Sequence, residues 1–145
     1  MISLQEINEE NWYECCQLKV ASDQEAYMEP NAVSILQSHY EQTLRAFAIL
    51  NNGKMAGLLM YNTVPEELDS IWVYRIMIDS SMQGQGIGKA AALLMIEQMA
   101  QLPGARSIAV GYHPDNLAAH HLYASLGFID KGDRFGREMA VLKEL

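Results

Sequence analysis

Hydrophobic and polar positions along the chain predict strands interleaved with helices, an α/β (α+β) pattern. Period-two alternation or short apolar runs predict strands at residues 2–7, 45–50, 55–63, 70–78, 107–112, 128–131 and 138–143. Apolar positions at helical spacing predict helices at residues 9–20, 31–44, 88–102 and 116–126. No repeat, linker or low-complexity stretch interrupts this order, so we expect residues 1–145 to form a single domain.

The N-terminal half contains one clear turn and one irregular segment. Residues 51–54 read Asn-Asn-Gly-Lys between two apolar runs, and Asn-Gly in that setting is typical of a tight hairpin. We expect Asn8 to cap the first helix, with Trp12, Cys16 and Val20 on one face. Residues 22–29 show no clear periodicity, and no regular element is predicted there.

A glycine-rich turn between an apolar strand and a good helix former lies at the centre of the chain. The turn consists of Gln83, Gly84, Gln85, Gly86, Ile87, Gly88 and Lys89. The first N–H groups of a helix lack partners within the helix and carry partial positive charge, which favours a bound phosphate. Glycines let a phosphate approach the backbone and tolerate a tight concave turn. The stretch therefore predicts an anion site formed by backbone amides.

The spacing of the glycines in this turn does not match either of two well-known phosphate-binding loop motifs. The dinucleotide-binding fingerprint requires G-x-G-x-x-G and an acid about 20 residues further on. Here the third glycine comes one residue early, and residues 104–110 contain no acid. The nucleoside-triphosphate loop requires G-x-x-x-x-G-K and then Ser or Thr, whereas Gln83 stands five residues before Gly88 and Ala90 follows Lys89.

The pattern that remains is Q/R-x-x-G-x-G/A after a strand, which Gln83, Gly86 and Gly88 match. This turn resembles the acetyl-CoA loop of the GNAT acetyltransferase superfamily. A second stretch, residues 113–128, resembles the N-x-x-A-x-x-x-Y-x-x-x-G-F segment of the same superfamily. Two motifs in the right order and spacing make the resemblance specific.

The second motif also predicts a complete short helix. Asn116 is expected to cap its start and Gly127 to end it in a left-handed conformation. Leu126 and Phe128, together with Leu122, are expected to turn inward. Asn116 and Tyr123 are expected to point elsewhere.

The resemblance implies the GNAT fold over essentially the whole length: a mixed, mostly antiparallel sheet of six or seven strands, flanked by about four helices and splayed between the fourth and fifth strands. It also implies that acetyl-CoA binds in this opening as cosubstrate. Its pantetheine would pair with exposed strand backbone, and its diphosphate would contact the turn amides. The cofactor-binding residues implied in this way are Ile76, Met77, Ile78, Gln83, Gly84, Gln85, Gly86, Ile87, Gly88, Lys89 and Asn116.

The same resemblance implies an N-acetyltransferase that moves the acetyl group of acetyl-CoA to a primary amine by direct attack in a ternary complex. Such transfer requires an unprotonated amine, a donor at the developing oxyanion and a proton for the departing thiolate. Tyr123 matches the tyrosine proton donor of the family. The general base is left open between Glu29, Glu25 and Asp69, because Tyr74 stands where polyamine-acetylating relatives tend to carry an acid.

Residues 22–29, Trp72, residues 75–79 and residues 136–145 also resemble the bacterial spermidine/spermine (diamine) N-acetyltransferases. Carboxylates along a groove would hold a polycation such as spermidine or spermine, and aromatic rings would face its methylene or ammonium groups. The substrate-binding residues expected on this basis are Glu25, Tyr27, Glu29, Trp72 and Tyr74. The alternatives are acetylation of an amino acid, an aminoglycoside-like drug or a protein N-terminus, and a non-catalytic acetyl-CoA-binding regulatory module.

Composition narrows the partners and the compartment. Ten basic against eighteen acidic residues give a net charge of −8, which repels phosphate polymers, so nucleic acid is not expected. No apolar stretch approaches the roughly 20 residues of a membrane span, and the N-terminus lacks a signal-peptide pattern, so we expect no membrane association and a cytoplasmic protein. Adjacent Cys15 and Cys16 and four scattered histidines suit no metal site. Relatives commonly dimerise, which makes a homodimer possible.

Overall fold

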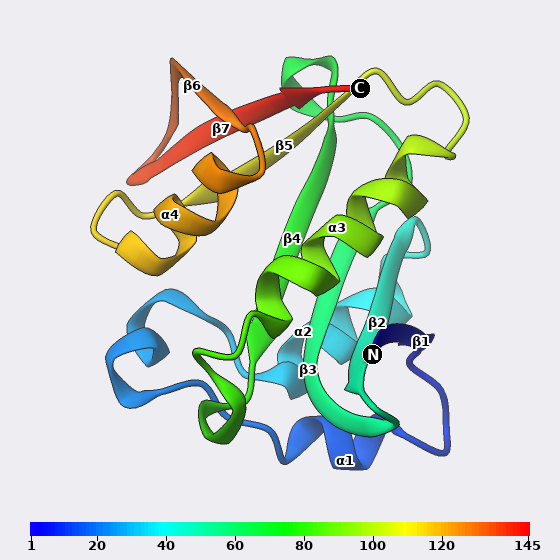
Figure 1. The fold of residues 1–145 in the computed structure, drawn as a ribbon. Coiled ribbons are helices and arrows are strands. Elements are labelled where there is room, and N and C mark those ends of the chain that lie inside the picture. The colour runs from blue at the N-terminus through cyan, green and yellow to red at the C-terminus, as the bar shows by residue number, and fades with distance from the viewer.

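A seven-stranded sheet runs through the computed structural model, which describes all 145 residues (Figure 1). Its strands lie in the order β1-β2-β3-β4-β5-β7-β6, and every neighbouring pair is antiparallel except the parallel pair β4–β5. The mixed, mostly antiparallel sheet is therefore confirmed. The strands are β1 (Ile2–Glu6), β2 (Leu44–Asn51), β3 (Lys54–Asn62), β4 (Ile71–Ile78), β5 (Ser107–Tyr112), β6 (Ile129–Phe135) and β7 (Glu138–Glu144).

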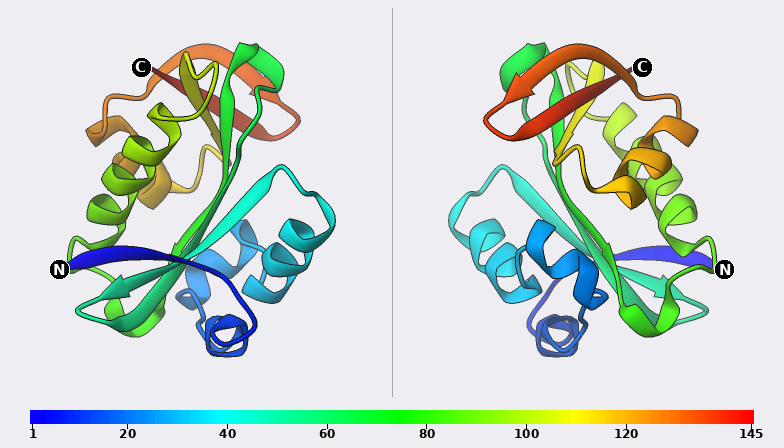
Figure 2. Two further views of the ribbon diagram at one scale, coloured as in Figure 1. Left: turned by 90° about the vertical axis from the view of Figure 1, so that its right-hand side faces the viewer. Right: turned by 90° about the vertical axis from the view of Figure 1, so that its left-hand side faces the viewer.

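Helices cover both faces of the sheet. The four α-helices are α1 (Trp12–Cys16), α2 (Asn31–Tyr40), α3 (Ile87–Ala100) and α4 (Leu117–Ser125). Three short 3-10 turns are η1 (Ser22–Tyr27), η2 (Glu67–Asp69) and η3 (Ser80–Met82). Figure 2 shows α3 and α4 on one face and α1 and α2 on the other.

Each face of the sheet has its own hydrophobic core. The larger core includes Met95 and Met99 of α3, both fully buried, and lies on the α3/α4 face. The smaller core includes Cys15 of α1 with Leu58 and Met60 of β3, and lies on the α1/α2 face. Strand residues alternate between the two cores because successive side chains point to opposite faces. Central strands are therefore apolar on both sides, as the sequence predicted for residues 70–78.

The opening expected between the fourth and fifth strands is confirmed. β4 and β5 pair only at residues 71–73 and 108–110. Beyond these residues the two strands diverge (Figure 1), so the later residues of β4 pair with β3 on one side only. The backbone groups on the other side face the gap.

A β-bulge in β4 turns two neighbouring side chains to the same face. In the β3–β4 register Met60 pairs with Arg75 and Tyr61 pairs with Val73, so Tyr74 is the extra residue. Tyr74 packs against the smaller core, and Arg75 lies opposite Met60 of that core. Both side chains therefore lie on the α1/α2 face. Nothing in the alternation of the sequence had indicated this.

The first helix is shorter than the sequence predicted. Asn8 accepts hydrogen bonds from the N–H groups of Glu10 and Asn11 at 2.8 and 3.1 Å, but the helix begins only at Trp12 and ends at Cys16. The residues predicted to share one apolar face do not form the buried side of this helix, because Trp12 is 45% exposed whereas Cys15 is fully buried. Packing on β3, not helical periodicity, decides which side chain turns inward.

Two other boundaries differ from the prediction. The second helix ends at Tyr40 and not near residue 44, because Leu44 already pairs with Asn62 in the sheet and is buried. β6 continues to Phe135 through an irregularity at residues 130–134, where a loop had been expected. The Asn-Gly hairpin at residues 51–54 is confirmed, with Asn51 paired to Lys54.

Candidate active site

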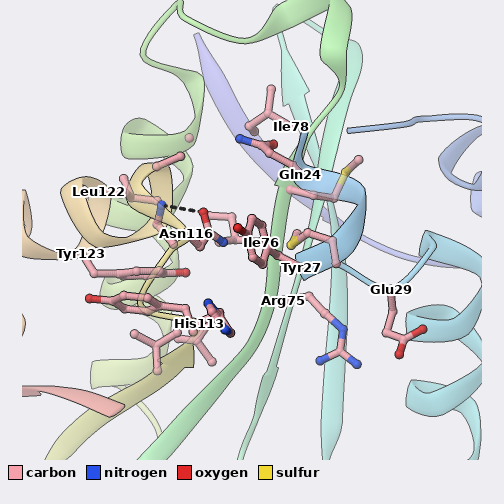
Figure 3. Close-up of a pocket in the computed structure, with 18 of the residues that line it drawn as sticks. Gln24, Tyr27, Glu29, Arg75, Ile76, Ile78, His113, Asn116, Leu122 and Tyr123 are labelled. Atoms are coloured by element: carbon pink, nitrogen blue, oxygen red, sulfur yellow. Dashed lines mark hydrogen bonds between the residues drawn. The ribbon is translucent and has the colours of Figure 1, made fainter. Parts of the chain in front are cut away.

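A groove of about 900 Å³ opens where β4 and β5 part (Figure 3). It is lined from both faces of the sheet: η1 and the residues that link it to α2 contribute one wall, and α4 and the start of α3 contribute the other. The groove therefore passes through the sheet from the α3/α4 face to the α1/α2 face. Such a passage gives two molecules access to one point without overlap.

The β4 backbone forms the edge of the groove. The Met77 carbonyl faces β3, since a Cβ added at Gly57 would lie only 2.1 Å from it. Strand alternation then turns the backbone groups of Ile76 and Ile78 toward the gap. The Ile78 carbonyl accepts a hydrogen bond there from Gln83 Nε2 at 3.0 Å. The polar edge of Ile76 thus remains free for an extended ligand.

The turn after β4 has the shape that an anion requires. Gly84 and Gly86 both have φ near +78°, and a Cβ added at either would meet nothing within 4 Å. Gly86 is the N-cap of α3 and offers no side-chain cap, so the first amides of the helix stay available. A diphosphate such as that of coenzyme A fits this open helix start, where free N–H groups and the helix dipole both favour negative charge.

The remaining turn residues hold the turn in position. Ile87 is buried in the larger core, and Gln83 Nε2 also reaches Gln24 Oε1 at 3.1 Å, which ties the turn to η1. Gln83, Gly84 and Gly88 line the groove. The turn residues outside the lining are Gln85, Gly86, Ile87 and Lys89.

Tyr123 belongs to the core and to the groove at once. Its ring is 3% exposed, stacks on Tyr112 with centroids 5.8 Å apart and meets Phe128 edge-on at 5.3 Å. The expectation that it points away from the core was therefore wrong: helix packing buries the ring, as it buries Leu126. Only the hydroxyl leaves the core, and it points into the groove (Figure 3).

The environment keeps the Tyr123 hydroxyl protonated and unpaired. Burial raises the pKa of Tyr123 well above the usual value of a phenol, and the neighbouring Tyr112 adds to this. Tyr112 turns its own hydroxyl the other way, to Nδ1 of His120 at 3.0 Å. The Tyr123 hydroxyl is thus a neutral donor facing the gap between the strands.

Asn116 and His113 line the groove next to Tyr123. Asn116 caps α4 as predicted, accepting from the N–H of Ala119 at 3.3 Å. His113 Nδ1 accepts from the N–H of Asp115 at 3.1 Å, which puts the proton of a neutral ring on Nε2. Its ring lies 5.7 Å from that of Tyr27 across the groove. Sequence reasoning had considered His113 only as a metal ligand and missed this position.

The α1/α2 side of the groove combines acidic, aromatic and basic side chains. Glu25, Tyr27 and Glu29 come from η1 and the residues just after it, where no regular element was predicted, and Tyr74 comes from the bulge in β4. Asp69 lies outside the groove, and Trp72 lines a separate, smaller cavity. Four of the five expected substrate-binding residues, all except Trp72, therefore line this side of the groove together.

Two further groups in this half of the groove were not predicted as site residues. Arg75 donates to the Tyr74 carbonyl at 2.9 Å, while its Nε is buried without a partner. Glu138 of β7 lines the groove, and its Oε1 would lie 3.1 Å from a Cβ at Gly111. Strand pairing across the sheet brings Glu138 here, and the glycine at 111 leaves room for it. No local sequence signal could have revealed either contact.

The split sheet, the glycine turn at a helix start and the buried tyrosine together define an acyl-CoA-binding transferase. The sequence profile of the Acetyltransferase (GNAT) family matches residues 3–128, and the chain belongs to this family. It is an N-acetyltransferase, and acetyl-CoA is the cosubstrate of the family. No helix is long and apolar enough to span a membrane.

Individual relatives differ in the acceptor that their names state. The chain is 26% identical over 150 residues to the spermine/spermidine N(1)-acetyltransferase of Bacillus subtilis, covering 99% of each. It is 28% identical over 130 residues to the ribosomal protein bS18-alanine N-acetyltransferase of Escherichia coli, covering 85% of each. The spermidine N-acetyltransferase of Vibrio cholerae, solved with CoA and spermine, has a similar fold: TM-score 0.77 at 17% identity, over 99% of this chain and 95% of that one.

Proposed function

We propose that the chain acetylates a primary amine of a polyamine such as spermidine or spermine, by direct attack within a ternary complex. The observation that carries this proposal is the groove through the sheet, which has an anion-binding turn on one face and carboxylates on the other. A polycation is attracted by Glu25, Glu29 and Glu138. The Bacillus subtilis relative, of which this chain covers 99%, is named for the same acceptors.

The proposed acetyl-CoA site uses backbone groups more than side chains. The backbone groups of Ile76 and the N–H of Ile78, which face the gap, would hold pantetheine by strand-like hydrogen bonds, while Met77 contributes apolar packing. Amides of residues 83–89 would bind the diphosphate, and Asn116 would border the site from α4. Bound here, acetyl-CoA supplies a thioester at the gap between β4 and β5.

Tyr123 is the proposed proton donor to the departing thiolate. Its hydroxyl faces the groove, has no partner within the protein and keeps its proton to high pH. A general acid must hold its proton until the reacting group needs it. For the general base we retain Glu25 and Glu29, which line the groove, and not Asp69, which does not.

A second candidate acceptor carries a carboxylate next to its amine, as a free amino acid does. The buried, unpaired Nε of Arg75 favours it, because an orphan guanidinium N–H in a groove suits a carboxylate oxygen. An amino acid needs a positive group in the groove for its carboxylate, whereas a polyamine needs negative groups for its ammonium ions. One assay with a panel of amines therefore distinguishes the two acceptors.

The test is a thiol-release assay with acetyl-CoA across a panel of amines: spermidine, spermine, propylamine, free amino acids, an aminoglycoside and an alanine-terminated peptide. We expect the highest kcat/KM with spermidine or spermine. Turnover confined to amino acids would support an acceptor whose carboxylate binds Arg75 and would reject a polyamine acceptor. Calorimetry with CoA runs in parallel, so that a failure to bind the cosubstrate is distinguished from the wrong acceptor.

A further inference from the structure

A second cavity of about 280 Å³ adjoins the groove on the α1/α2 face. Its lining consists of Glu66, Glu67, Trp72, Tyr74 and Phe135. Tyr74 lines both spaces, so the cavity and the acceptor side of the groove meet at this residue. The cavity is small for a whole ligand but suits one end of a long one.

Two of its walls are aromatic and fixed in orientation. Trp72 and Phe135 meet edge to face, with centroids 5.4 Å apart and planes at 90°. Trp72 Nε1 donates to the Glu67 carbonyl at 2.9 Å, which locks the indole plane. Aromatic faces held in this way attract a cation through the ring quadrupole.

The third wall holds a carboxylate with one oxygen unsatisfied. Tyr74 donates its hydroxyl to Glu66 Oε1 at 2.7 Å, whereas Glu66 Oε2 is buried without a partner. Burial, followed by the hydrogen bond and charge of Glu66, raises the pKa of Tyr74 to about 12, so Tyr74 remains a donor. A buried carboxylate oxygen without a donor costs free energy, and a cation held beside the carboxylate offsets that cost through its charge.

No basic side chain of the protein lines this cavity. Arg75, the nearest candidate along β4, lines the groove and donates to the Tyr74 carbonyl. The missing partner of Glu66 is therefore not supplied by the fold. Its chemistry is that of an alkylammonium ion: a cation with N–H donors for the carboxylate and methylene groups for the rings.

We infer that this cavity, the Glu66 cavity, receives the second ammonium group of the polyamine while the reacting amine lies in the groove beside Tyr74. The inference rests on the proposed function and extends it, since it assigns the distal end of the acceptor to a particular place. The chain of methylenes would pass the Tyr74 ring. A monoamine has no group to fill this cavity.

Kinetics of Glu66→Gln test the assignment. Glutamine keeps an acceptor for the Tyr74 hydroxyl but removes the negative charge. We expect the KM for spermidine to rise about 10-fold or more relative to the KM for propylamine, because a buried charge-assisted hydrogen bond is lost. The matched control is Glu97→Gln, an exposed carboxylate on α3 that lines neither the groove nor the cavity, which should leave both KM values unchanged. Equal changes in KM for both amines would overturn the inference.

A binding measurement keeps the inference separate from the proposed function. The chain has two tryptophans, so Trp12→Phe leaves Trp72 as the only indole. Spermidine should change the Trp72 fluorescence of this variant saturably, and Glu66→Gln should weaken that binding about 10-fold or more. A change without any acetylation of polyamines would support the cavity and reject the proposed reaction. A fluorescence signal insensitive to spermidine would reject the cavity even if acetylation occurs.

Discussion

Single side chains in this protein serve the core and the site together, and Tyr123 is the clearest case. Its ring fills the space between Tyr112 and Phe128, so removing the whole side chain would damage the core. Its hydroxyl, by contrast, contributes nothing to internal hydrogen bonding. The phenolic oxygen can therefore be tested without disturbing the fold.

Tyr123→Phe should lower kcat by about 10²-fold or more, the scale of a lost general acid, with an unchanged melting temperature. Steady-state kinetics and thermal unfolding measure the two effects. Tyr112→Phe is the matched control, because its hydroxyl points to His120 and away from the groove. A Tyr123→Phe enzyme as fast as the parent would remove the hydroxyl from the mechanism.

At the scale of elements, the sequence predicted what local pattern decides. The Asn-Gly hairpin, the glycine turn before α3 and the Asn116 cap of α4 each have a signature within a few residues, and each is present. The short α1 and the bulge at Tyr74 depend instead on packing against β3, which periodicity does not report. The same bulge directs Arg75 into the groove, and this is why Arg75 was missed as a site residue.

The β3–β4 pairing makes a sharp prediction at Gly57. A Cβ there would lie 2.1 Å from the Met77 carbonyl, so Gly57→Ala must push the two central strands apart. We expect a loss of about 2 kcal/mol or more in the free energy of unfolding, measured by urea denaturation.

Gly88→Ala is the control for Gly57→Ala. Residue 88 lies in the first turn of α3, and a Cβ added there would meet Ile78 Cγ1 at 3.6 Å, an ordinary contact. Alanine also favours the helix, so stability should be equal or higher by up to about 1 kcal/mol. Equal losses in the two variants would mean that the close approach of β3 and β4 does not limit stability.

Across the whole molecule, the site could not be predicted beyond its local motifs. The groove brings together residues as distant as Gln24 and Glu138, and only the sheet order β4-β5-β7 explains their proximity. The same assembly buries several groups that ionise at high pH. Burial raises the pKa of Cys15 from 9.0 to about 12, and it also raises the pKa of Tyr61, Tyr74 and Tyr123.

Raised pKa values predict how stability depends on pH. A folded pKa above the unfolded one means that the full stabilisation is present below the unfolded pKa and is lost as pH rises toward the folded pKa. The melting temperature should therefore fall progressively above pH 9, where unfolded Cys15 begins to ionise, and further above pH 10, where unfolded tyrosines do. Calorimetric scans between pH 8 and 11 measure this fall. Cys15→Ala should show a shallower fall, and an identical slope would contradict the assignment.

The passage through the sheet has a kinetic consequence. In the proposed reaction, donor and acceptor would enter the groove from opposite faces of the sheet, so neither would block the entrance of the other. Binding then requires no fixed sequence of arrival, and either product is free to depart while its counterpart is still held. Initial-rate patterns should accordingly be those of a random sequential mechanism, with each product competing only against the substrate that shares its entrance.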